Sequence, residues 1–137
     1  MMDEDPAVST ERERSRRFGF ASLTAWASLG FLLEAAHAFK LSAYLDQPLR
    51  RELLLWAHAH GVGLSLVVLA YAALGITPHS IRFGKPLRAA AVLMPAAFAL
   101  GVLGHSEADP GPSIWLVPAG ALLLIYALAG VTRALRA

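Results

Sequence analysis

The chain contains no cysteine among its 137 residues, so disulfides, thiolate metal sites, iron–sulfur ligation and thiol catalysis are all excluded. Charged residues are scarce as well, at 16%, where an average soluble domain has about a quarter. Hydrophobic residues make up 56% of the sequence, and the mean hydropathy is +0.52. These values indicate a membrane protein, in which any metal is held by nitrogen or oxygen.

Four apolar segments are long enough to cross a hydrocarbon core of roughly 30 Å, which takes about 20 helical residues. They are residues 18–39, 53–75, 87–105 and 114–131. The polar stretch "MMDEDPAVSTERERSRR" at residues 1–17 is expected to be a disordered or surface-lying cytoplasmic tail. Short connections that contain proline or glycine make successive helices antiparallel neighbours. We therefore predict an all-α fold, a four-helix transmembrane bundle, with residues 18–137 forming one domain.

Lysine and arginine are distributed unevenly between the two ends of the predicted bundle. With the N-terminus in the cytoplasm, nine basic residues lie inside, and three, Lys40, Arg50 and Arg51, lie outside. The loop with Glu107 and Asp109 carries no basic residue and fits an outer position. This bias predicts an N-in, C-in topology, in what we expect to be a bacterial inner membrane. Because the basic residues orient helices, no nucleic-acid partner is expected.

Ionisable side chains within the predicted helices gather toward the outer, periplasmic end. Glu34 and His37 lie near the outer end of the first helix. His58 and His60 lie about one to two turns below the outer start of the second helix, and His105 closes the third. The inner halves of the four predicted helices carry no such group, with Arg88 counted in the loop before the third helix. Since intramembrane ionisable groups are costly and usually functional, this histidine cluster is the predicted site.

The spacing of these residues limits how they can act together. Glu34 and His37 are spaced i, i+3, which puts a carboxylate and an imidazole on one helix face, as in the Glu-x-x-His pairs that bind metal in bundle proteins. His58 and His60 are two residues apart, roughly 200° around a helix, so both cannot point at one centre. Gly61 and Gly63, which follow them, allow another helix or a flat cofactor to approach closely.

The segment "WAHAHGVGL" of the second helix resembles the His-x-His transmembrane motif of the haem–copper oxidase and nitric-oxide reductase superfamily. It is also similar to a helix of small uncharacterised four-helix membrane proteins. In that superfamily such histidines bind haem iron and copper, which implies that His58 and His60 are ligands in separate centres. A chain of 137 residues is too short for the core of such an oxidase, so the resemblance implies metal or haem binding and not oxygen reduction.

Two kinds of site remain open at this point. In the first, His37 and one of His58 or His60 ligate haem b between antiparallel helices. Arg50 or Arg51 at the outer surface would then pair with the haem propionates.

In the second, Glu34, His37, a histidine of the second helix and His105 form a compact site for iron, copper or zinc. His79, in the "TPHS" loop at the cytoplasmic side, is interpreted as an ordinary surface residue.

The predicted function is that of a small integral membrane metalloprotein in redox or electron transfer, with a quinone or a redox protein as partner. Whether it is an enzyme is left open. The alternative is a noncatalytic subunit or assembly factor of a larger membrane complex, which the small size and short loops suit. Proton transfer from Glu34 to the histidines is a third possibility. We also expect a homo-oligomer, because so small a bundle needs a partner to enclose a cofactor.

Overall fold

The computed structural model describes residues 5–104, 106 and 109–136, and every regular element in this part of the chain is a helix. In chain order the elements are α1 (Pro6–Ala38), α2 (Ser42–Leu45), α3 (Pro48–Ala70), η1 (Tyr71–Gly75), η2 (Ile81–Phe83), α4 (Gly84–Gly101), η3 (Pro112–Trp115) and α5 (Leu116–Ala134). η1 is one turn of π-helix that continues α3, and η2 and η3 are 3₁₀ turns that lead into α4 and α5. The prediction of an all-α fold is confirmed at this level.

Four helical stretches are long and apolar enough to cross a membrane, namely Pro6–Ala38, Pro48–Gly75, Ile81–Gly101 and Pro112–Ala134. Each contains most of one predicted apolar segment, so the number and order of the spans agree with the sequence analysis. The chain is therefore an all-helical protein with four candidate membrane spans.

The first helix begins at Pro6 rather than at Phe18, so residues 6–17 of the predicted polar tail are helical. Asp5 caps this helix, because its carboxylate accepts a hydrogen bond of 2.8 Å from the N–H of Ala7. Pro6 follows in the first turn, where a missing N–H costs nothing. The 33 residues of α1 span about 50 Å, which exceeds the hydrocarbon core. The polar first turns therefore extend beyond the apolar part of the helix.

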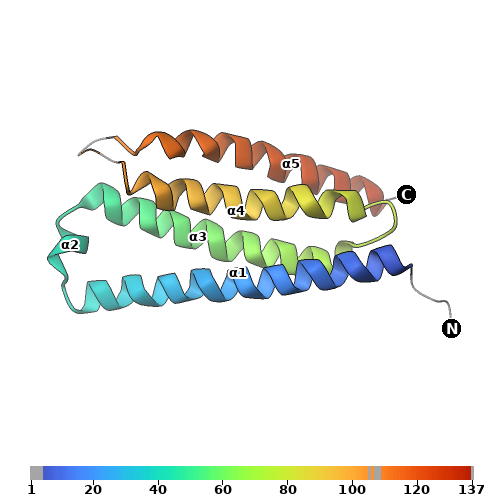
Figure 1. The fold of residues 1–137 in the computed structure, drawn as a ribbon, viewed down its shortest axis with the longest axis horizontal. Coiled ribbons are helices and arrows are strands. Elements are labelled where there is room, and N and C mark those ends of the chain that lie inside the picture. The colour runs from blue at the N-terminus through green and yellow to red at the C-terminus, as the bar shows by residue number, and fades with distance from the viewer. Residues whose placement is uncertain (1–4, 105, 107–108, 137) are drawn as a thin grey trace.

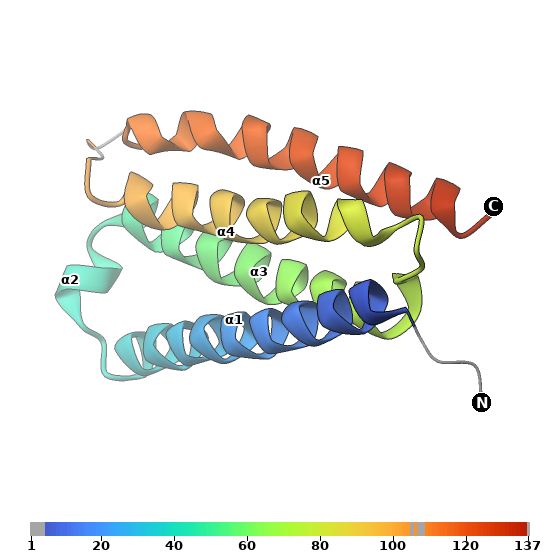
Figure 2. The ribbon, with the colours of Figure 1, turned by 45° about the vertical axis from the view of Figure 1, so that its right-hand side comes forward.

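The four long helices lie side by side in a row, in the order α1, α3, α4, α5, each antiparallel to the next (Figures 1 and 2). In the described part of the chain the two edge helices, α1 and α5, do not pack against each other. The predicted bundle is thus opened into a row, whereas the first and last helices of a closed bundle are neighbours. α4 is the most enclosed helix, with 44% of its most apolar stretch buried, against 17% for α1.

Both edge helices have one end at the same side of the row. α1 begins there, α5 ends there, and the connection 76–83 between α3 and α4 lies beside them (Figure 1). We call this side the terminal end. α2 and the connection between α4 and α5 lie at the opposite end (Figure 2).

A buried ion pair joins α1 to α4 at the terminal end. Glu11 is 8% exposed, and its carboxylate accepts hydrogen bonds from Arg88 and, at 2.9 Å, from the hydroxyl of Ser15. Arg88 Nη1 also donates to Ser15 Oγ at 2.6 Å, and Arg88 Nη2 lies 3.3 Å from Glu11 Oε2. From the sequence, Glu11 is expected in the polar tail and Arg88 in the loop before the third helix. The longer helices bring the two charges together and enclose them.

Removal of Arg88 leaves the Glu11 carboxylate enclosed without its cation. We expect Arg88→Met to lower the free energy of unfolding by about 3–5 kcal/mol. The matched control is Arg17→Met, which breaks an exposed pair with Glu13 whose side chains are 80% and 53% exposed. That change is expected to cost less than about 1 kcal/mol. Thermal unfolding in detergent, followed by circular dichroism, measures the stability of both variants. An equal loss of stability in the two would contradict a structural role for the buried pair.

Candidate functional site

His58 lies in the contact between α3 and α1. Its Nδ1 is 2.8 Å from the backbone oxygen of Trp26. Its ring rests on the backbone of Gly30, where any Cβ would overlap the imidazole. One turn along α3, Gly61 in the same way receives the indole of Trp26. The two glycines therefore bring the helices close enough for His58 to bond across to α1.

His60 packs toward α4 instead. Its ring centroid lies 5.0 Å from that of Phe98 and 5.7 Å from that of Trp56. Trp56 stacks on Phe98 with centroids 6.4 Å apart, so the three rings form one aromatic cluster. The Nδ1 of His60 is 2.9 Å from the backbone oxygen of Trp56, one turn earlier in α3.

The hydrogen bonds define the tautomer of both neutral histidines. A backbone carbonyl can only accept a hydrogen bond, so Nδ1 must carry the proton in His58 and in His60. The lone pair of Nε2 is then the one available to ligate a metal. Metal-bound histidines usually make such a bond from the other ring nitrogen, and it sets the orientation of the ring. Both rings are held in a ligating form.

The two imidazoles face different neighbours, as their spacing predicts: His58 contacts α1 and His60 contacts α4. Among the described residues, no group of three or more histidine, cysteine, aspartate or glutamate side chains is placed to hold a metal ion. The described residues of one chain thus do not assemble the compact non-haem site. His105, one of its expected ligands, lies outside the described residues.

Glu34 and His37 are exposed in the last turns of α1. The helix ends directly after them, because Lys40 adopts a left-handed φ of 53° and its N–H donates to the carbonyl of His37 at 3.0 Å. The chain then enters α2, whose buried Tyr44 meets the His37 ring edge-on at 6.5 Å. The carboxylate and the imidazole thus lie on the exposed side of an edge helix.

The two expected propionate partners lie in the first turn of α3. Arg50 Nη1 donates to the carbonyl of Ala43 at 3.4 Å. Its Nε is buried and has no hydrogen-bond partner among the described residues. Arg51 is partly buried beside it. Buried donors are normally paired, so Arg50 has a donor that a bound group would satisfy.

The sequence analysis did not include Tyr44 or Phe98 in the site. Tyr44 lies in the connection "KLSAYLDQPLRRE", and the one feature of the sequence that could have indicated it is that it is an aromatic residue within a polar stretch. Phe98 is one of many apolar residues in its segment, and only the packing of α3 against α4 places it beside His60.

No known protein family, curated protein or solved structure matches this chain. The class of the protein therefore follows from the fold alone: a helical membrane protein with four candidate spans arranged in a row. The similarity of "WAHAHGVGL" to the oxidase motif stays a prediction.

The contact that positions His58 can be tested at two glycines of α3. Gly61→Ala places a methyl group in the Trp26 ring and is expected to destabilise the protein by about 1–3 kcal/mol. Gly63→Ala is the matched control, since a Cβ there meets nothing within 4 Å, and alanine favours the helix by about 1 kcal/mol. Relative to the unsubstituted protein, the melting temperature in detergent should be lower for Gly61→Ala and higher for Gly63→Ala. The reverse order would refute the contact.

The tautomers of His58 and His60 are observable by nitrogen NMR of histidine-labelled protein. Each ring is expected to show a protonated Nδ1 and an unprotonated Nε2, because the proton is shared with a carbonyl. His79, exposed on the connection 76–83, serves as an internal reference. An unprotonated Nδ1 together with a protonated Nε2 at both positions would rule out the hydrogen bonds and the ligating form.

Proposed function

We propose that the protein binds haem or a transition metal through His58 and His60 and acts in redox or electron transfer. The observation that carries this proposal is the pair of carbonyl bonds, 2.8 and 2.9 Å long, that leave Nε2 of each ring as the ligand atom. Histidines within a membrane span are costly, and a ligand role gives them a reason to be there.

Haem fits this donor set better than a compact metal site does. A haem needs only axial ligands from the protein, and one imidazole can supply one. A compact ion needs about three or four side chains, which the described residues of one chain do not bring together. Two diverging imidazoles would therefore serve separate centres. Arg50 and Arg51 would pair with propionates, and bound haem would supply one-electron chemistry.

The open edge of α1 supports a partner in the membrane. Glu34 and His37 are exposed there, and an ionisable side chain that faces lipid is unfavourable unless something covers it. A second copy, a redox protein or a larger complex would cover this edge and supply further ligands. A quinone is a suitable electron partner in the same apolar setting.

The same edge favours a second candidate function. A noncatalytic subunit or assembly factor would use α1 as its contact with a larger complex, and Glu34 and His37 would then bind the partner rather than a metal.

We further propose that the terminal end faces the cytoplasm of a bacterial inner membrane and that the histidines lie toward the periplasm. Support comes from the basic residues, nine of which belong to the terminal end and three to the opposite end.

The proposal predicts an optical or metal signature in protein purified from membranes in mild detergent. We expect either a Soret band that shifts on reduction with dithionite or stoichiometric iron, copper or zinc in the same sample. Because each histidine ligates its own centre, His58→Ala and His60→Ala should each lower the total occupancy by about half, and the double variant should abolish it. The matched control, His79→Ala, removes an exposed histidine at the terminal end and should leave the occupancy unchanged.

Glu34→Gln separates the two kinds of site, because it should weaken a non-haem metal and leave a histidine-ligated haem intact. Absence of both haem and metal from well-folded protein would exclude the redox proposal and favour the subunit function. Equal loss in His79→Ala would show that the metal is bound nonspecifically.

A further inference from the structure

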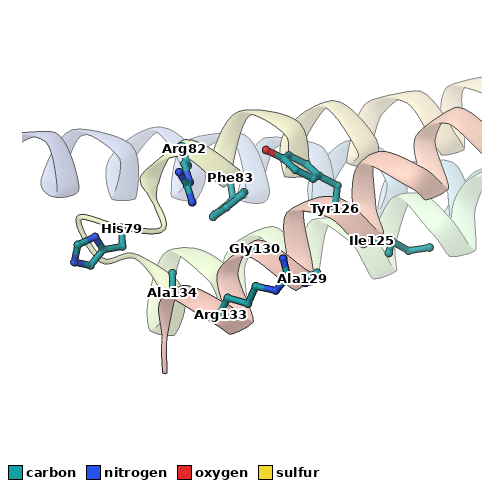
Figure 3. Close-up of a pocket in the computed structure, with 9 residues that line it drawn as sticks. All are labelled: His79, Arg82, Phe83, Ile125, Tyr126, Ala129, Gly130, Arg133 and Ala134. Carbon is teal, nitrogen blue, oxygen red and sulfur yellow. The ribbon is translucent and has the colours of Figure 1, made fainter. Parts of the chain in front are cut away.

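A groove of about 530 Å³ opens at the terminal end, and its lining includes none of the histidines of α3. It lies between the connection 76–83 and the part of α5 from Ile125 to Ala134 (Figure 3). His79, Arg82 and Phe83 line it on one side, and α5 lines it on the other. Volumes of this size are typical of sites that bind small molecules.

The groove carries positive charge without a compensating carboxylate. Arg82, Arg133 and His79 line it, and none of the described lining residues is acidic. Glu11 lines a neighbouring groove on the other side of Arg82, but its carboxylate is engaged by Arg88. Charge complementarity therefore favours an anion. Two guanidinium groups are well suited to phosphate, which each can bind in a bidentate manner.

The ring of Phe83 holds the groove in shape. It lies on the backbone of Gly130, where a Cβ would overlap it, and it meets Tyr126 edge-on at 5.6 Å. The guanidinium carbon of Arg82 lies 4.8 Å from the centre of the same ring, so the aromatic face orients the cation.

The connection 76–83 is itself fixed by Ser80, which is fully buried. The Ser80 hydroxyl donates to the carbonyl of Gly75 at 2.6 Å and accepts from the N–H of Thr77 at 2.7 Å. The hydroxyl of Tyr71 donates to the carbonyl of Ser80 at 3.1 Å. The groove is therefore preformed, and a ligand does not have to order the connection.

The position of the arginines along the spans distinguishes between ligands. Arg82 is the second residue of the candidate span Ile81–Gly101, and Arg133 is the last but one of Pro112–Ala134. Both arginines thus lie at the ends of candidate spans, which is where a spanning helix reaches the membrane surface. Ile125, 64% exposed, continues the groove along α5 toward the apolar region. This combination fits a charged headgroup with an attached chain.

We infer that the groove binds an anionic membrane phospholipid. Its phosphate lies between Arg82 and Arg133, and its acyl chain follows α5 past Ile125. Basic pockets between membrane helices bind acidic headgroups in this way. The inference does not depend on the proposed haem or metal site.

Native mass spectrometry of the full chain in detergent tests this inference by titration with dioleoylphosphatidylglycerol. We expect the double variant Arg82→Gln/Arg133→Gln to bind this lipid about thirty-fold more weakly, since each basic group contributes to attraction of the headgroup. The matched control, Arg16→Gln/Arg136→Gln, removes the same charge from exposed residues outside the groove and should leave the affinity nearly unchanged. Arg133→Gln alone alters an exposed residue and should show part of the loss in a folded protein.

Two further probes separate the lipid from other sources of phosphate. Dioleoylphosphatidylcholine, which is zwitterionic, is expected to bind more weakly than phosphatidylglycerol. Inorganic phosphate is expected not to displace bound phosphatidylglycerol. Equal binding of the two lipids, or equal loss in the control variant, would overturn the inference. Displacement of the lipid by inorganic phosphate would show that the groove binds a soluble anion rather than a phospholipid.

Discussion

The close contact between α1 and α3 governs the placement of His58. Within a bilayer, apolar side chains gain little by leaving lipid for protein, so helices associate through close packing and hydrogen bonds. Gly30 and Gly61 provide the close packing, and His58 bonded to the Trp26 carbonyl provides the hydrogen bond. The bond that joins the helices is also the one that fixes the tautomer of His58. Packing and ligand chemistry are therefore coupled at a single residue.

The row of helices separates two kinds of chemistry. The imidazoles lie near the middle of the span Pro48–Gly75, one against each neighbouring helix, and arginines line a groove at the terminal end. A closed bundle would enclose both sets in one interior. The row instead leaves α1 and α5 each with an uncovered flank, and the exposed carboxylate of Glu34 makes the α1 flank the more polar of the two. The flanks are thus chemically distinct surfaces for lipid or protein.

The number and order of the spans were predictable, because the length of an apolar run is a property of the sequence alone. The start of α1 was not predictable from apolar segments, because residues 6–17 are polar. The signals for this start are the cap residue Asp5 and Pro6 in the first turn. The divergence of His58 and His60 follows from helical spacing. Which helix each one meets depends on the order of helices in space, as does the Glu11–Arg88 pair, whose members are 77 residues apart.

The consecutive packing has a consequence for assembly. Each long helix contacts the one before it, so each can dock as it enters the membrane, and contacts that are local in sequence form fast. The Glu11–Arg88 pair is different, because its two members arrive 77 residues apart during synthesis. Until α4 is present, the Glu11 carboxylate stays hydrated, since burial of a lone charge is unfavourable. The Glu11–Arg88 pair therefore forms late, only after the first three spans have assembled.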